Sequence, residues 1–278
     1  MSDTISPRGC GAVKIWLLLL VGLLLFIFFV IPLCTIHPPP VRDIKQKAQL
    51  CSFEAALELT AHEFGDDPPS DANDETALPY CGAMKLTEAM MGQDLLGFHP
   101  RSGFRLDGTD PNTGELLYTA ATLEDRRGPF LPSESALAYR LVDVYGKGST
   151  GAFAEHAYVL CDTYERQRPG GAMTGMPILY YRADSEGTAH DVNDPDNPGN
   201  VYDYRDNHAL ISLGVPGDPD AVHPLTDPKR FYLNTLNPRA KEHPEPYRRD
   251  TYILISAGRD GLYGTKDDIR NYDWKYRE

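Results

Sequence analysis

The sequence lacks the motifs that mark the common enzyme classes. His62-Glu63 is not followed by the second histidine of an HExxH zinc motif, and there is no GxSxG nucleophile elbow, P-loop or dinucleotide-binding glycine pattern. The 8 histidines are scattered along the chain, and a lone histidine is more often a surface or hydrogen-bonded core residue than a ligand or base. We therefore expect no catalytic and no organic-cofactor-binding residues, and a hydrolase with an acidic site is the weakest alternative.

Cysteine is scarce, and its spacing indicates neither a zinc site nor a redox pair. The chain has 5 cysteines and no CxxC pair. Two of them, Cys10 and Cys34, lie before or within the apolar segment described below. Cys51, Cys81 and Cys161 follow it, so one disulfide among these three stays open as an alternative if this part faces an oxidising compartment. The sequence does not select the pair.

Positive charge is also under-represented. Lysine and arginine number 27 against 40 aspartates and glutamates, which gives a net charge of -13. Such a balance argues against binding to nucleic acid or to anionic lipid surfaces, because both need basic faces. It fits an acidic extracytoplasmic domain that binds divalent cations, and solubility alone is the alternative explanation for most of these acids. About 240 residues follow the apolar segment, which is enough for one domain, or one domain with an insertion.

Only one long hydrophobic run is present, the uncharged stretch IWLLLLVGLLLFIFFVIPLCTI at residues 15–36. As a helix it spans about 33 Å, enough to cross a hydrocarbon core of about 30 Å. A cleaved signal peptide usually has a shorter apolar core and an A-x-A site, and no small residue precedes Cys34 as in a lipobox. We predict an uncleaved single-pass anchor, with a cytoplasmic tail at residues 1–14 and a proline-rich linker at residues 37–40.

The orientation of this anchor follows less directly from charge. Arg8 and Lys14 on one side are nearly balanced by Arg42, Lys45 and Lys47 on the other. The short tail and the large acidic domain favour an amino terminus in the cytoplasm.

Hydrophobic periodicity after the linker predicts two helices. Val41–Phe64 is expected to be helical, with Gly65 as its stop, and a second short helix is expected within Thr76–Gly97. The first helix should bury one apolar face, widened by Phe53 and Leu57. That predicted face consists of Ile44, Ala48, Cys51, Ala55 and Leu59.

The remainder predicts strands separated by turn-rich segments, which makes the fold class α+β. Loops are expected at 110–114 and 191–200, because neither segment has the spacing of an EF-hand, and a short helix is expected around Arg230–Leu236. The predicted strands are rich in β-branched and aromatic residues. They are Ala138–Tyr145, Ala157–Cys161, Pro177–Ala183, Ala209–Leu213 and Tyr252–Ile255.

The last strand leads into a loop that combines glycines with carboxylates. Gly258, Gly261 and Gly264 permit tight turns at little steric cost, and Asp260, Asp267 and Asp268 supply charged oxygens. Hard oxygen donors without cysteine or histidine suit Ca²⁺ better than a transition metal. Spacing alone leaves open an acidic surface turn without an ion, because Asp-Gly pairs are common in turns.

The loop also resembles a known motif. Ser256-x-Gly-x-Asp260-Gly, then Gly264-Thr-x-Asp267-Asp268-Ile, then Asn271 and an aromatic residue, is similar to the carboxy-terminal calcium loop of the major pseudopilin of type II secretion systems. The resemblance implies one structural Ca²⁺ held by the side chains of Asp260, Asp267 and Asp268. Backbone carbonyls near Ile255, Ser256 or Leu262 complete the implied ligand set.

The same resemblance implies a fold, a location and a role. Residues 41–278 would form an extracytoplasmic pseudopilin-like domain, in which a spine helix packs on an antiparallel sheet and a long central insertion is added. The protein would be a non-catalytic structural component of a type II secretion or pilus-like system. It would be anchored in the bacterial inner membrane with its carboxy-terminal domain in the periplasm, and pseudopilin or secretion-machinery subunits would be its partners.

Three positions depart from the family pattern. Lys266 stands where many relatives carry another acid. The fifth residue after Gly11, the only candidate cleavage glycine, is Trp16 rather than glutamate. Pro38–Pro40 interrupts the path from anchor to domain, where pilin-like subunits continue a helix. The last two departures favour an alternative, a stand-alone membrane-anchored periplasmic binding module that reuses the pseudopilin fold.

Overall fold

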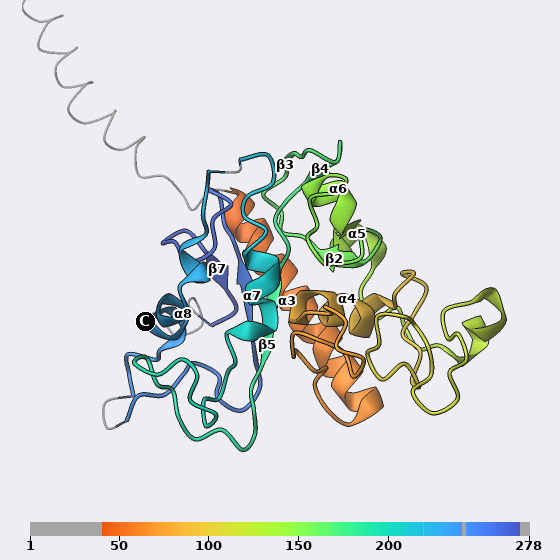
Figure 1. Ribbon diagram of the computed structural model, residues 1–278, viewed down its shortest axis with the longest axis horizontal. Helices are drawn as coiled ribbons and strands as arrows, with labels where there is room; N and C mark the ends of the chain where they lie inside the picture. The colour runs from red at the N-terminus through yellow and green to blue at the C-terminus, as the bar shows by residue number, and fades with distance from the viewer. Residues whose placement is uncertain (1–40, 219, 241–242, 273–278) are drawn as a thin grey trace, which may run out of the picture. The chain divides into compact units, whose positions relative to one another are not determined.

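The computed structural model describes residues 41–218, 220–240 and 243–272 (Figure 1). The predicted tail, anchor and linker at residues 1–40 lie outside the described residues. Among the helices that are described, none combines the length and the apolar character that a membrane crossing requires. Contacts between residues divide the chain into two units, Met1–Val41 and Arg42–Glu278. The class of the second unit is α+β with antiparallel strands, as predicted.

The first described helix, α3, has the predicted bounds Val41–Phe64, but it buries the opposite face to the one expected. All five residues of the predicted apolar face are exposed, and Ile44 and Leu59 each keep 55% of their surface accessible. Phe53 and Leu57, expected only to widen that face, lie at the centre of the buried one with Leu50. The helix ends at Gly65, whose N–H donates to the Ala61 carbonyl at 2.7 Å.

Polar side chains on the buried face of α3 explain why a count of apolar residues picks the wrong side. Gln49 Nε2 donates to the Cys161 carbonyl at 2.9 Å, and Gln46 Oε1 accepts from the Thr163 N–H at 2.8 Å. Glu54 pairs with Arg248 at 2.9 Å. Because these buried groups are hydrogen-bonded, the helix can bury them without a large desolvation penalty.

Three antiparallel strands, β5 (Leu179–Arg182), β6 (Tyr252–Ser256) and β7 (Ile269–Arg270), form the central sheet in the order β5-β6-β7. Leu179 pairs with Ile255, which pairs in turn with Arg270. Strand alternation places Tyr180, Tyr252 and Leu254 in one apolar cluster with the buried residues of α3.

The opposite face of the sheet carries the second apolar cluster. Tyr181 and Ile253 pack there with Leu210 of α7 (Arg205–Ile211) and with Phe231 of α8 (Pro228–Thr235). Helices therefore cover both faces of a short sheet, which buries every residue of β6.

Helix α4 (Gly82–Met91) is the second predicted helix, and all of its residues are buried. It packs against β5 and against β2 (Tyr158–Leu160). A Cβ at Gly82 would lie 2.2 Å from the Tyr180 carbonyl oxygen, so only glycine permits this close approach to the sheet.

Smaller elements complete the described chain. Strand β2 pairs with β1, and β3 pairs with β4, both antiparallel. The segments 110–114 and 191–200 are turns and loops, as predicted. The bounds of the remaining elements are Ala120–Asp125 (η2), Ser133–Ala136 (α5), Ala138–Arg140 (β1), Leu141–Tyr145 (α6), Arg166–Gln167 (β3), Met173–Thr174 (β4) and Pro224–Thr226 (η3).

Two strand predictions are wrong in part or in full. Only the first three residues of Ala138–Tyr145 are extended, and Leu141–Tyr145 forms α6. Ala209–Leu213 is not a strand, because its first part belongs to α7. Within α7 the Asn207 carboxamide donates to the Tyr180 carbonyl at 2.7 Å. This tertiary contact favours a helix over the strand propensity of the short apolar run. The predicted helix around Arg230–Leu236 is present as α8.

The three cysteines of the described domain are free thiols, so none of the three alternative disulfides forms. Cys51 is exposed on α3, whereas Cys81 and Cys161 are buried.

Candidate functional site

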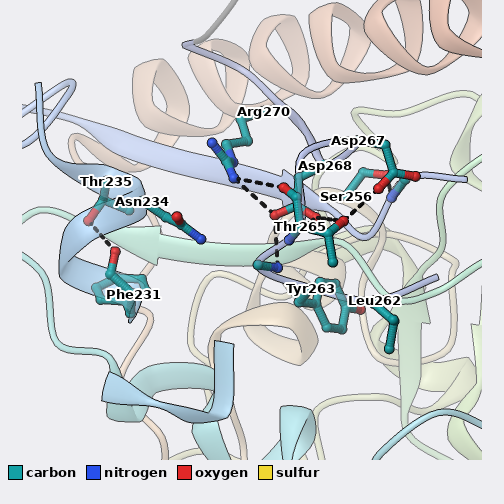
Figure 2. Close-up of polar contacts among 12 residues, drawn as sticks. Phe231, Asn234, Thr235, Ser256, Leu262, Tyr263, Thr265, Asp267, Asp268 and Arg270 are labelled. Atoms are coloured by element: carbon teal, nitrogen blue, oxygen red, sulfur yellow. Dashed lines mark hydrogen bonds and ion pairs between the residues drawn. The ribbon is translucent and has the colours of Figure 1, made fainter. Parts of the chain in front are cut away.

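The candidate site is the loop of residues 257–268, which joins β6 to β7 (Figure 2). Strand β7 was not predicted. By pairing Ser256 with Ile269 and Ile255 with Arg270, it turns the carboxy-terminal loop into the tip of a β-hairpin. Both ends of the loop are therefore held by the sheet.

Two glycines allow the loop to close on itself. Gly258 has a φ of 68°, and a Cβ there would lie 2.2 Å from the Asp267 carbonyl oxygen. Gly264 has a φ of 93°, and its Cβ would lie 2.8 Å from the backbone nitrogen of Leu225. Both positions therefore need glycine for conformation and for space.

Tyr263 anchors the middle of the loop in the core. Its ring is completely buried, its N–H donates to His223 Nδ1 at 3.2 Å, and its hydroxyl donates to the Pro177 carbonyl. Burial lowers the pKa of His223 to about 4, so the imidazole is neutral and can accept this hydrogen bond at neutral pH. The aspartates on either side of Tyr263 are thereby held near the surface at fixed positions.

Asp260 and Asp267 face each other across the loop. The Asp260 N–H donates to Asp267 Oδ2 at 2.9 Å, and the two carboxyl groups are within side-chain hydrogen-bonding reach. Burial, and then the proximity of Asp267, raises the pKa of Asp260. Burial also acts on Asp267, but hydrogen bonds from Thr265 and Asp260 outweigh it and lower the pKa of Asp267. Of these two close carboxyl groups, Asp267 therefore ionises more readily than Asp260.

Asp268 is the most buried of the three aspartates. Its carboxylate accepts from the N–H groups of Gly264 at 2.9 Å and Thr265 at 3.2 Å, and it pairs with Arg270 at 3.2 Å. Burial raises the pKa of Asp268 to about 6, against the opposing effect of Arg270. Figure 2 shows Arg270 reaching Asp268 from one side while Thr265 lies between Asp268 and Asp267.

The three residues whose backbone carbonyls were predicted as calcium ligands lie in different surroundings. Ile255 and Ser256 lie in the buried strand β6, and the half-buried Leu262 donates its N–H to Asp260 Oδ1 at 2.8 Å. The Ser256 hydroxyl is engaged elsewhere, because it donates to Asp162 Oδ2 at 2.9 Å and accepts from the Gly258 N–H.

The structure thus brings Asp260 and Asp267 together and places Asp268 behind Thr265, against Arg270. In the described residues no set of three or more His, Cys, Asp or Glu side chains is arranged to hold a metal ion. The donor chemistry nevertheless fits Ca²⁺ in kind, since hard carboxylate and hydroxyl oxygens line a glycine-rich loop. Burial is the largest cause of the raised pKa of Asp260, and the carboxyl group of Asp267 adds to it.

Three supporting residues carry roles that the sequence did not assign. The Thr265 hydroxyl donates to Asp267 Oδ1 at 2.5 Å, and Arg270 forms an ion pair with Asp268. Asp162 accepts a hydrogen bond from the Ser256 hydroxyl at the base of the loop. Thr265 stands inside the recognised motif, so a signal for it existed. Asp162 is 94 positions from Ser256 in sequence, and no local pattern connects them.

A separate cavity of about 440 Å³ bears on the hydrolase alternative. It is lined by Ser70 and Asp206, and the Ser70 hydroxyl donates to Asp206 Oδ2 at 2.5 Å. Burial raises the pKa of Asp206 to about 8, so the carboxyl is mostly protonated at neutral pH. A protonated carboxyl is a poor general base, and this pair does not form an activated serine nucleophile.

Comparison with known proteins adds no relative to this picture: no family model, no curated protein and no solved structure matches the chain.

Proposed function

We propose that the chain is a non-catalytic, membrane-anchored structural protein of a type II secretion or pilus-like system, with a pseudopilin-like periplasmic domain stabilised by calcium. The observation that supports it most directly is the pairing of Asp260 with Asp267 at the tip of the β6–β7 hairpin. In this proposal pseudopilin or secretion-machinery subunits are the partners, and the predicted segment at residues 15–36 is the anchor.

Charge balance explains why the loop would need an ion. Asp260, Asp267 and Asp268 gather beside Thr265, and Arg270 neutralises one of them. A bound Ca²⁺ supplies two positive charges to the remaining carboxylates. The chain's own contribution is a preformed loop, in which glycine turns, the buried Tyr263 and strand β7 hold the carboxylates close together before any ion binds.

Calcium binding is tested directly on the full-length chain in detergent micelles by isothermal titration calorimetry. We expect one Ca²⁺ per chain for the wild type and none for the double variant Asp260→Asn/Asp267→Asn. Asp250→Asn is a suitable control, because its side chain is 88% exposed and lies beyond the other end of β6. Absence of a calcium signal in the wild type would remove the ion from the proposal.

The second candidate is a stand-alone periplasmic binding module on the same anchor. Trp16 in place of the expected glutamate and the break at Pro38–Pro40 favour it. Chemical cross-linking in native membranes separates the two candidates, because a fibre subunit gives a ladder of homo-oligomers and a stand-alone module gives a single band.

A further inference from the structure

A second pocket lies where α3 ends, far from the loop of residues 257–268, which we call the aspartate loop. Helix α3 has 24 residues and is therefore about 36 Å long. The loop contacts the beginning of the helix, where Arg259 lies 3.6 Å from Asp43. The pocket, of about 330 Å³, is lined by Phe64 at the other end. The pocket and the loop are therefore separate sites that share no residue.

Aromatic rings form one wall of this pocket. The ring centroids of Phe64 and Phe98 are 4.7 Å apart, and those of Phe98 and Phe104 are 5.2 Å apart. Phe98 is almost fully buried, whereas Phe64 and Phe104 are half-buried. Aromatic faces at a partly open site attract cations as well as apolar groups.

The charges at the pocket leave one carboxylate without a cation of its own. Asp66, Asp67 and Arg182 line it, and Arg182 forms an ion pair with Asp66. Within the described part of the chain, no hydrogen bond or ion pair reaches the carboxylate of Asp67. Burial raises the pKa of Asp67, although Arg182 and Arg248 oppose the effect, and Arg248 is itself paired with Glu54. Two carboxylates against one guanidinium give the pocket a net charge of about -1.

We propose that this pocket receives an arginine side chain from a peptide segment of a partner protein. A guanidinium stacks on aromatic rings, forms paired hydrogen bonds with a carboxylate and is weakly hydrated, so it satisfies Phe64, Phe104 and Asp67 together. The volume is at the low end for ligand pockets, about 300–1,000 Å³, and suits one long side chain. Pro100 and Gly103 at the rim are exposed, so the peptide backbone stays outside.

The test uses the full-length chain in detergent micelles and fluorescence anisotropy of the labelled peptide Gly-Gly-Arg-Gly-Gly. The same peptide with citrulline keeps the shape of arginine and removes its charge. We expect the arginine peptide to bind about tenfold more tightly than the citrulline peptide. The Asp67→Asn variant should weaken arginine binding by about tenfold and leave citrulline binding unchanged, whereas Asp250→Asn should change neither.

A variant with the opposite sign guards against misfolding as an explanation. Arg182→Gln removes the competing positive charge and should strengthen binding of the arginine peptide severalfold, which a damaged fold cannot do. Equal binding of the arginine and citrulline peptides would overturn the proposal, as would equal effects of Asp67→Asn and Asp250→Asn. Competition by choline as effective as that by acetyl-arginine amide would also overturn it, because the pocket would then be a general quaternary-ammonium site.

Discussion

Replacing Asp260 by asparagine separates the two roles of this side chain. Asparagine keeps the oxygen that accepts the Leu262 N–H at 2.8 Å, but it removes the negative charge that faces Asp267. Burial and then Asp267 raise the pKa of Asp260. A raised carboxyl pKa adds stability that is fully present below the unfolded pKa and is lost as pH rises through the folded pKa. Near pH 7 the ionised Asp260 therefore destabilises the calcium-free fold, and asparagine removes this penalty.

The magnitude follows from linkage. A ligand that binds only the folded state at about 100 times its Kd adds about 2.7 kcal/mol to the free energy of unfolding. For a domain of this size, about 1 kcal/mol shifts Tm by about 2–4 °C. The wild-type chain should therefore melt about 5–10 °C higher in excess Ca²⁺ than in EGTA. Asp260→Asn should show little response to calcium.

The assay is differential scanning fluorimetry of the full-length chain at pH 7 in detergent, with either Ca²⁺ or EGTA. We expect a crossover: Asp260→Asn melts at or above the wild-type temperature in EGTA and below it in Ca²⁺. Asp250→Asn should follow the wild type in both conditions. A wild-type Tm that is the same with and without calcium would refute the reasoning, and so would an equal calcium response in Asp260→Asn.

Other predictions concern the core and its titratable groups. Phe53→Ala should lower the free energy of unfolding by about 3–5 kcal/mol and Ile44→Ala by less than about 0.5 kcal/mol, as measured by urea denaturation; the reverse order would restore the predicted face of α3. Between the unfolded pKa of Asp206 and its folded pKa of about 8, unfolding free energy should fall as pH rises, because the folded state keeps a proton that the unfolded state releases. Asp206→Asn should flatten that fall in a series of urea curves, and an unchanged slope would contradict the assignment. Cys51 should react with maleimide in the native state, whereas Cys81 and Cys161 should react only after unfolding, because both thiols are buried and burial raises their pKa values to about 11 for Cys81 and about 12 for Cys161. The labelled positions are identified by peptide mass spectrometry, and native labelling of Cys81 or Cys161 would show that these thiols are accessible.

Local signals predicted where α3 begins and ends, but they did not predict which side it buries. The prolines before Val41 and the glycine after Phe64 are sequence neighbours of the helix, and both restrict the backbone directly. The buried side depends on partners distant in sequence. Gln49 reaches the carbonyl of Cys161, 112 positions away, and Glu54 meets Arg248, 194 positions away. From sequence alone a polar residue is assigned to the exposed face of a helix, because its distant hydrogen-bond partner is not known.

The same distinction applies to the candidate site. The spacing of glycines and aspartates predicted a closed loop, because each glycine conformation is a local property. The pairing of β7 with β6 was missed, since Ile269–Arg270 is too short to show alternation. The ion pair between Asp268 and Arg270 was not predicted either. Arg270 lies outside the quoted motif positions, and its effect depends on the fold of the hairpin.

The loop is coupled to α3 at two places, and this coupling links a local site to the domain as a whole. At one end, Arg259 lies 3.6 Å from Asp43 in the first turn of the helix. At the other, Asn271 follows β7, and its Nδ2 donates to Glu54 at 3.3 Å while its side-chain oxygen accepts from the Leu254 N–H at 3.0 Å. If the hairpin tip opened, Asn271 would shift and leave Glu54 with fewer partners at a buried position, which is costly for a carboxylate. The stability of the aspartate loop therefore contributes to how firmly the helix is held against the sheet.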